Sequence, residues 1–142
     1  MSVNDLAGHL RPACEEVLET MFFTSVMQDA EPSPELLCGA GLRFSGSPSG
    51  SFQVRTSTVA ARVLAAGFLG EAESDITAER AGEVVCELAN MLCGSVLSCM
   101  DRAAIFELSQ PERAGTWVGS PSASCCFELP EGLMEVAITF DS

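Results

Sequence analysis

The sequence has 142 residues, 47% of them hydrophobic, which is enough for one domain with a sizeable core and too apolar for a disordered chain. Asp and Glu number 20 against seven basic residues, all arginine, and the net charge of −13 argues against nucleic acid and anionic membranes as partners. With no lysine and a single histidine, His9, the chain lacks a Schiff-base or phosphate-loop lysine, a histidine-based triad and a multi-histidine metal site.

The sequence is typical of a cytoplasmic protein. No apolar run reaches the ~18 residues of a membrane span, and the first residues, MSVNDLAGHLRP, lack the basic and apolar regions of a signal peptide. The seven cysteines form an odd set without a C-x-x-C spacing, and several fall on predicted apolar faces. Reduced thiols in the core are therefore the better interpretation, against a metal site or a disulfide framework.

The first half of the chain predicts one amphipathic helix and a β-hairpin. A helix from about Asp5 or Pro12 to Ser25 places apolar side chains on one side and glutamates on the other. A loop with two prolines follows it. Residues 36–44 and 51–56 are then predicted as two strands, joined by the Gly/Ser/Pro-rich loop SGSPSGS.

The second half begins with a short helix and ends with several strands. Residues 58–68 predict an apolar helix rich in alanine, which stops at Gly67 or Gly70. An acidic loop then leads to the longest helix of the chain. Beyond that helix, prolines and glycines separate further strand candidates at residues 103–108, 116–118, 124–129 and 133–140.

The segment from Ile76 to Asp101 has the longest helical periodicity in the chain. Two residues are candidates for its N-cap, Asp75 and Thr77. At about 100° per residue, one broad face is apolar and is expected to be buried. This face comprises Ala81, Val85, Leu88, Leu92, Ser95, Val96 and Cys99.

A narrow polar stripe lies opposite that apolar face. Glu83, Glu87, Asn90 and Gly94 follow one another at intervals of four, three and four residues, so they stack along consecutive turns. A solvated helix face would explain most such stripes. However, a mid-helix Asn costs up to roughly 0.7 kcal/mol relative to Ala, and a Gly costs about 1 kcal/mol. These two costs predict that the stripe is used, with Gly94 leaving space for something to approach Asn90.

The order of the elements predicts an α+β fold, with an antiparallel β-sheet that carries long helices on one face. The chain is also nearly a repeat, since residues 18–22 (LETMF) resemble residues 88–92 (LANML) at an offset of seventy. Two helix-plus-strands halves related by a pseudo-twofold are therefore expected. In this alignment Val17 takes the place of Glu87 and Thr20 that of Asn90, which leaves one site per chain.

Residues 59–94 carry a resemblance to a known family. The run AARVLAAGFLG, an acidic loop and then ELANMLCG resemble the CheC/CheX/FliY group of bacterial chemotaxis phosphatases, whose hallmark is Glu-x-x-Asn on a long exposed helix, followed by a glycine and later a proline. Glu87, Asn90 and Gly94 match this pattern, and Pro111 matches the proline at a slightly shorter spacing. Glu83 departs from it, because the CheC type carries Asp or Ser there. With one intact pair and a short length, the chain is most similar to CheX.

The resemblance implies a single CheX-like domain over residues 1–142 that acts as a phosphatase on the aspartyl phosphate of a CheY-like response regulator. Asn90 would orient the attacking water, Glu87 would pair with the regulator's conserved lysine, and Glu83 and Gly94 would contact the regulator. The regulator would supply the Mg²⁺, so neither a metal nor a cofactor of the chain's own is expected. The resemblance also implies a homodimer of this chain, which CheX-like proteins form by joining sheet edges.

The polar stripe suits this chemistry on physical grounds. Phosphoryl transfer through a loose transition state requires positioning and charge stabilisation, with little covalent work. A neutral amide both accepts and donates hydrogen bonds, so Asn90 can hold a water in line. The alternative is a non-catalytic binding or assembly module of the same fold, in a two-component or flagellar-switch system. A third interpretation is a coincidental stripe on an unrelated α+β domain. Replacement of Asn90 separates the first two, because a scaffold would tolerate it.

Overall fold

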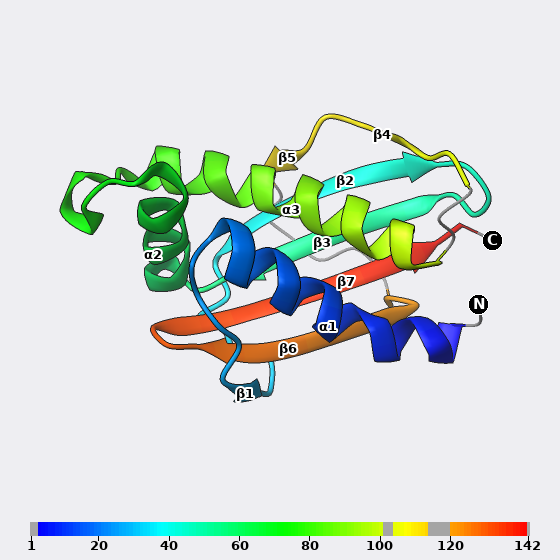
Figure 1. Cartoon of the computed structure of the whole chain (residues 1–142), viewed down its shortest axis with the longest axis horizontal. Helices are drawn as coiled ribbons and strands as arrows, with labels where there is room; N and C mark the ends of the chain where they lie inside the picture. Colours follow the sequence, from blue (N-terminus) through cyan, green and yellow to red (C-terminus); the bar gives the residue numbers. More distant parts are fainter. Residues whose placement is uncertain (1–2, 101–103, 114–119, 142) are drawn as a thin grey trace.

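Three helices lie on one face of a seven-stranded antiparallel sheet (Figure 1). The structure is a computed structural model, and it describes residues 3–100, 104–113 and 120–141. This arrangement confirms the predicted α+β class. In chain order the elements are α1 (Val3–Met21), β1 (Gln28–Asp29), β2 (Cys38–Ser45), β3 (Gly50–Thr56), α2 (Thr58–Leu69), the 3-10 helix η1 (Glu73–Asp75), α3 (Ala78–Met100), β4 (Glu107–Leu108), β5 (Glu112–Arg113), β6 (Ala123–Leu129) and β7 (Gly132–Phe140).

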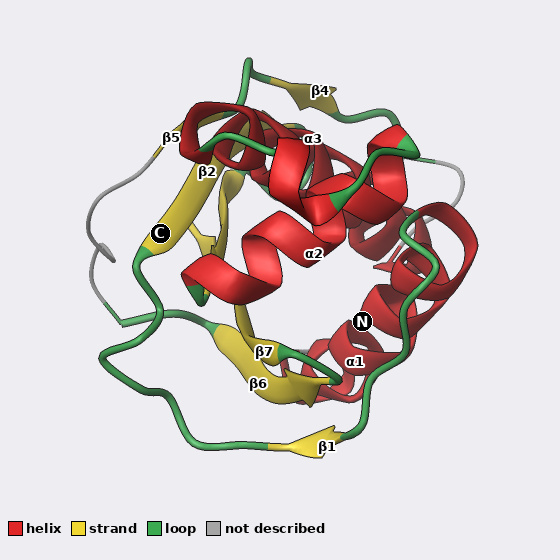
Figure 2. Cartoon of the chain, turned by 90° about the vertical axis from the view of Figure 1, so that its left-hand side faces the viewer, coloured by secondary structure: helices red, strands yellow, loops and turns green. Residues whose placement is uncertain are grey.

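The sheet has the strand order β1-β6-β7-β3-β2-β4, and β5 also pairs with β2. The two hairpins, β2–β3 and β6–β7, join through β3 and β7, where Val54 pairs with Val136. Burial alternates along β3, as expected for a strand with one face on the core. Figure 2 shows the helices on one side of this sheet, with α2 across its end.

The element order repeats, as predicted. α1 is followed by β1, β2 and β3, while α3 is followed by β4, β5, β6 and β7. The short strands of each half pair with a long strand of the other half: β1 pairs with β6, whereas β4 and β5 pair with β2. The helices follow the same exchange: α1 packs on β6, and α3 packs on β2. The pseudo-twofold arrangement of two helix-plus-strands halves is thus confirmed.

The predicted offset of seventy between the two helices is wrong by one residue. Val17 is buried whereas Glu87 is exposed, so the two do not occupy equivalent places. An offset of seventy-one instead matches buried residues with buried residues, for example Val17 with Leu88 and Leu18 with Ala89. Burial decides the register, because the face that packs on the sheet is what the two helices share.

Local signals explain where the helices begin and end. The hydroxyl of Ser57 accepts a hydrogen bond from the backbone N–H of Ala60 and caps α2, which ends at the left-handed Gly70. The hydroxyl of Thr77 accepts from the N–H of Arg80 at 3.1 Å, so Thr77, and not Asp75, caps α3. α1 begins at Val3, before either predicted start, and ends at Met21.

The predicted strands are confirmed in the hairpins and incomplete at the edges. The strands expected at 36–44, 51–56, 124–129 and 133–140 correspond to β2, β3, β6 and β7. The strand expected at 103–108 is reduced to the two residues of β4, and the one expected at 116–118 lies outside the described residues. The two-residue strands β1 and β5 were not predicted, because a segment this short has no periodicity to recognise.

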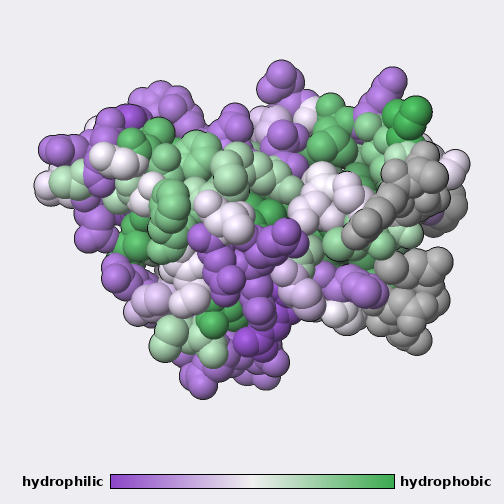
Figure 3. Space-filling model, viewed as in Figure 1, coloured by the Kyte–Doolittle hydropathy of each residue, from purple (hydrophilic) through white to green (hydrophobic). Residues whose placement is uncertain are grey.

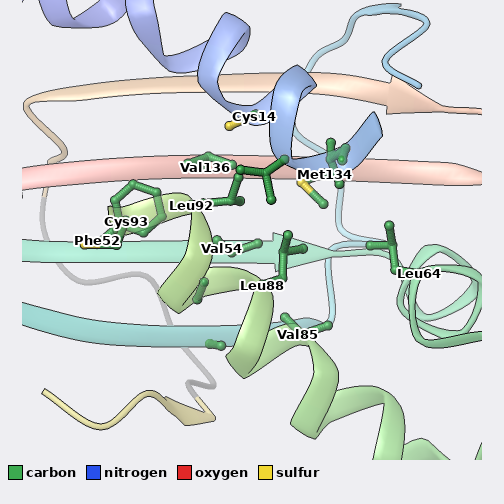
Figure 4. Close-up of a cluster of buried hydrophobic side chains, with 14 of the residues drawn as sticks. Cys14, Phe52, Val54, Leu64, Val85, Leu88, Leu92, Cys93, Met134 and Val136 are labelled. Atoms are coloured by element: carbon green, nitrogen blue, oxygen red, sulfur yellow. The ribbon is translucent and has the colours of Figure 1, made fainter. Parts of the chain in front are cut away.

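The core lies between the helices and the sheet. Side chains of α3 and α1 meet those of β3 and β7, and Leu64 of α2 closes one end (Figure 4). Leu88, Leu92 and Val96 are fully buried, as predicted for the apolar face of α3. Two assignments to that face are wrong: Ser95 is only half-buried and Cys99 is exposed. Both lie near the end of α3, on the side where it meets solvent beside α1.

The seven cysteines are free thiols, as predicted. Cys14, Cys93 and Cys126 are buried, whereas Cys99 is exposed and therefore not a core residue. α3 is long and apolar enough to cross a membrane by length and composition alone. Here its apolar side packs on the sheet and on α1, as in the core helix of a soluble protein.

Candidate functional site

The packing of α3 determines which of its residues face outward. Leu88 and Leu92 are fully buried against the sheet, so the polar stripe on the opposite side points away from it. Glu83 and Glu87 are exposed, while Asn90 and Gly94 are half-buried. The structure therefore places all four predicted site residues on one outer line of a helix whose opposite side is packed in the core.

Asn90 is a polar side chain with unused hydrogen-bonding capacity. Its amide makes no hydrogen bond with any residue in the described ranges, although it is half-buried. A carboxamide carries both an acceptor oxygen and two N–H donors. It is therefore available to a water molecule or a partner, and not committed to the core of its own chain.

Glu87 and Glu83 are likewise uncommitted. Neither forms an ion pair with a described arginine, in contrast to Glu15, Glu71 and Glu135. The chain has no lysine that could approach them. The stripe thus presents two exposed negative charges next to a neutral amide.

The glycines of α3 differ in what surrounds them. A Cβ built at Gly94 would meet no atom within 4 Å, so nothing inside the described chain requires glycine there. A Cβ at Gly82 would lie 2.5 Å from Cζ of Arg113. Gly94 therefore costs about 1 kcal/mol of helix stability without an internal packing reason, which fits an approach from outside.

Arg113 was not anticipated from the sequence. It lies on β5, which pairs with β2 and brings the guanidinium against α3 at Gly82. Burial raises the pKa of the Cys86 thiol, and the positive charge of Arg113 partly offsets this increase. Burial also raises the pKa of Cys38 on β2, again against the charge of Arg113. No sequence signal marks the position, since β5 has only two residues.

The equivalent face of α1 is different. Under the offset of seventy-one, Glu16 and Glu19 occupy the places of Glu87 and Asn90. Both glutamates are exposed, and the hydroxyl of Thr20 donates to the backbone oxygen of Glu16 at 2.7 Å. A hollow between α1 and α3 is lined by Glu16, Ser95, Ser98 and Cys99. Figure 3 shows hydrophilic residues gathered over α1 and paler or hydrophobic ones along α3.

The described residues contain no group of three or more His, Cys, Asp and Glu that could hold a metal ion. Pro111, the proline of the sequence pattern, lies directly before β5, so the pattern and the strand that carries Arg113 are adjacent.

Comparison with known families identifies a match over this region. The family model described as "Chemotaxis phosphatase CheX" matches residues 39–114, which is more than half of the chain. The matched segment runs from the second residue of β2 through β3, α2, α3, β4 and β5. No curated protein matches the sequence.

Solved structures share the fold across nearly the whole chain. The chemotaxis protein CheX from Vibrio vulnificus superposes with a TM-score of 0.80 at 18% identity, covering 99% of both chains. A chain of the CheX-CheY-BeF3-Mg+2 complex from Borrelia burgdorferi does so with a TM-score of 0.70 at 19% identity, again over 99% of both chains. FliY from Thermotoga maritima is more distant, with a TM-score of 0.59 at 12% identity over 97% of this chain and 89% of that one.

Proposed function

Because the chain belongs to the family of the chemotaxis phosphatase CheX, we propose that it hydrolyses the aspartyl phosphate of a CheY-like response regulator. The observation that carries the proposal is the placement of Glu87 and Asn90 on the outer side of α3. Glu87 is exposed, Asn90 is half-buried, and neither has a hydrogen-bond or ion-pair partner among the described residues. A complex of a CheX with CheY, BeF3 and Mg is known from Borrelia burgdorferi. BeF3 is a mimic of a phosphoryl group, so that complex represents the kind of partner proposed here.

In this proposal Asn90 orients the attacking water. The amide accepts one hydrogen bond from the water and holds it in line with the P–O bond to the aspartate, which breaks as the new P–O bond forms. The products are inorganic phosphate and the free aspartate. The regulator would supply Mg²⁺, which would stabilise negative charge on the leaving carboxylate.

Glu87 has a different role, which is to bind. A free carboxylate three residues before Asn90 lies one turn away on the same face, where a lysine of the regulator can reach it. Glu83, one further turn away, extends the same contact surface. Gly94 leaves room on the other side of Asn90, since nothing in the described chain occupies the space above it.

We also propose a cytoplasmic homodimer that joins two copies edge to edge. β1 covers only the end of β6 at Phe127 and Glu128, so residues 123–125 of β6 have no outer strand partner among the described residues. An unpaired strand edge is stabilised when a second copy extends the sheet. Sedimentation or light scattering gives the mass, and a monomer at micromolar concentration would exclude this part.

The decisive experiment measures phosphate release from the phosphorylated response regulators of the same genome. Wild-type protein should accelerate the release from at least one of them. Asn90→Ala should bind that regulator with nearly unchanged affinity and lose the acceleration. If Asn90→Ala retains wild-type turnover, the chain is better described as a binding or assembly module of the same fold.

A further inference from the structure

The guanidinium of Arg113 lies against the backbone of α3 at Gly82. Its Cζ, Nε and one terminal nitrogen would lie 2.5, 2.6 and 2.8 Å from a Cβ at position 82. Such distances are closer than van der Waals contact allows, so only glycine at position 82 lets the guanidinium rest on the helix in this way. Because β5 pairs with β2 at Ala40, the backbone of Arg113 is also fixed next to α3.

Arg113 is also unusual among the arginines that the structure describes. Most of these arginines form ion pairs with carboxylates: Arg11 with Glu15 and Asp29, Arg43 with Asp141, Arg55 with Glu135 and Arg80 with Glu71. Arg62 donates to the backbone oxygen of Glu73 at 3.5 Å. Arg113 is exposed, and it makes no ion pair or hydrogen bond with a described residue, in a chain with many more carboxylates than bases.

In the first half of the molecule, a different arginine links the helix to the short edge strand. Under the offset of seventy-one, Arg11 of α1 stands where α3 has Gly82. Arg11 binds Asp29 of β1, the short strand that flanks β6 as β5 flanks β2. In the half that carries Asn90, the arginine lies on β5 and the equivalent position on α3 is Gly82. The guanidinium of Arg113 therefore has no carboxylate partner among the described residues.

The position of Arg113 determines what it can reach. Gly82 and Asn90 are eight residues apart, which is about 12 Å along a helix. One phosphoryl group is too small to contact both a water held at Asn90 and a guanidinium at Gly82. In the proposed complex Arg113 therefore lies beside the partner's phosphorylation site and not within it. In the proposed complex carboxylates of the regulator hold Mg²⁺ at that site, so a guanidinium beside it faces acidic side chains.

We infer that Arg113 is a specificity-determining residue whose guanidinium binds a carboxylate on the response regulator, at the rim of the surface that Asn90 enters. It supplies the positive charge that the stripe itself lacks. Glu87 takes a cation of the regulator and Arg113 takes an anion, so together they orient the partner on α3. This inference rests on the proposed function.

The test compares affinities for a regulator loaded with BeF3 and Mg²⁺, measured by titration at low and moderate salt. Arg113→Ala should weaken binding by about threefold to fivefold, the scale of an exposed ion pair. Arg113→Glu should weaken it by more than about tenfold, because like charges then oppose each other. Both effects should shrink as salt increases. Turnover at saturating regulator should stay near the wild-type value.

Gly82→Ala provides a second test that leaves the charge of the chain unchanged. The added methyl group must displace the guanidinium, so the affinity should fall as it does for Arg113→Ala, while the helix is not weakened. Arg62→Ala is the matched control, because Arg62 is exposed on α2 away from the stripe, and it should bind as wild type does.

The possible outcomes distinguish the role inferred for Arg113 from the proposed phosphatase function. If wild-type protein binds and dephosphorylates a regulator but Arg113→Glu binds equally well, this inference is wrong and the proposed function stands. If wild-type protein neither binds nor acts on any regulator of its genome, both are wrong.

Discussion

Glu19 on α1 occupies the place that Asn90 occupies on α3, because the buried residues of the two helices align at an offset of seventy-one. Glu16 likewise stands where α3 has Glu87. A carboxylate in the place of the amide would repel a phosphoryl group and could not donate a hydrogen bond to it. The two halves therefore share an architecture, the proposed site lies in one of them, and the first half supplies matched controls for the second.

Asn90→Ala should lower turnover of the phosphorylated regulator by ~10²-fold or more, the scale seen when a positioning group is lost. The helix should survive, since Ala is the better helix former. Glu19→Ala and Thr20→Ala should leave turnover unchanged. Phosphate release under single-turnover conditions measures the effect. An equal loss in Glu19→Ala, with the fold preserved, would mean that both halves carry sites.

Glu87→Ala should weaken complex formation as well as turnover. The carboxylate is exposed and has no ion-pair partner among the described residues. In the proposed complex it forms an ion pair with a lysine of the regulator at a small desolvation cost. The defect should be about threefold to fivefold in affinity at low salt and smaller at higher ionic strength. Titration at two salt concentrations provides the measurement, with Glu16→Ala as the control. A salt-independent defect would argue against an ion pair.

Gly94→Ala should stabilise the protein and impair its function. Alanine in a helix interior gains up to about 1 kcal/mol over glycine, and the new methyl group meets no atom of the described chain. The same methyl group would enter the space through which a partner approaches Asn90, and a displacement of ~1 Å there can cost ~10²-fold in rate. The free energy of unfolding measured with urea should therefore increase, while the rate of phosphate release should decrease. Gly8→Ala on α1, also with open space around it, should change stability alone.

Stability should fall above pH 9 because of the buried thiols. Burial raises the pKa of Cys93 from 9.0 to about 12 and that of Cys126 to about 11. Between these limits the unfolded chain loses protons that the folded chain retains, so the free energy of unfolding decreases, by up to ~1.4 kcal/mol per pH unit for each thiol. The chain has neither tyrosine nor lysine to mask this titration. Cys93→Ala should reduce the slope measured by urea denaturation from pH 8.5 to 10.5, and an unchanged slope would contradict this account.

Long periodic segments were the part of the fold that sequence patterns predicted well. The apolar positions of α3 and the alternation in β3 both have the period of their element, so burial followed from spacing. The same patterns could not set the register between the two helices. A match of letters favoured an offset of seventy, but the side of each helix that meets the sheet depends on packing that no single segment contains.

For the site, the polar stripe was predictable because all its members lie on one helix. Arg113 was not, since its relation to Gly82 arises only when β5 pairs with β2, across 31 residues of chain. A glycine within a helix was visible in the sequence. The reason for Gly82 could not be read from the sequence, because it depends on the side chain that packs against it in the folded protein.

The exchange of strands between the halves has a consequence for biosynthesis. β7 is the last strand of the sheet along the chain, yet it lies at the centre, between β6 and β3. A nascent chain that ends before Phe140 therefore exposes the edge of β3 and the apolar undersides of α1 and α3 at once. Pairings of such long sequence separation form slowly, and unpaired edges favour aggregation. The β2–β3 hairpin can form early, but the chain must be released through Phe140 before β7 joins the two hairpins into one sheet, and until then the exposed edge of β3 is open to aggregation.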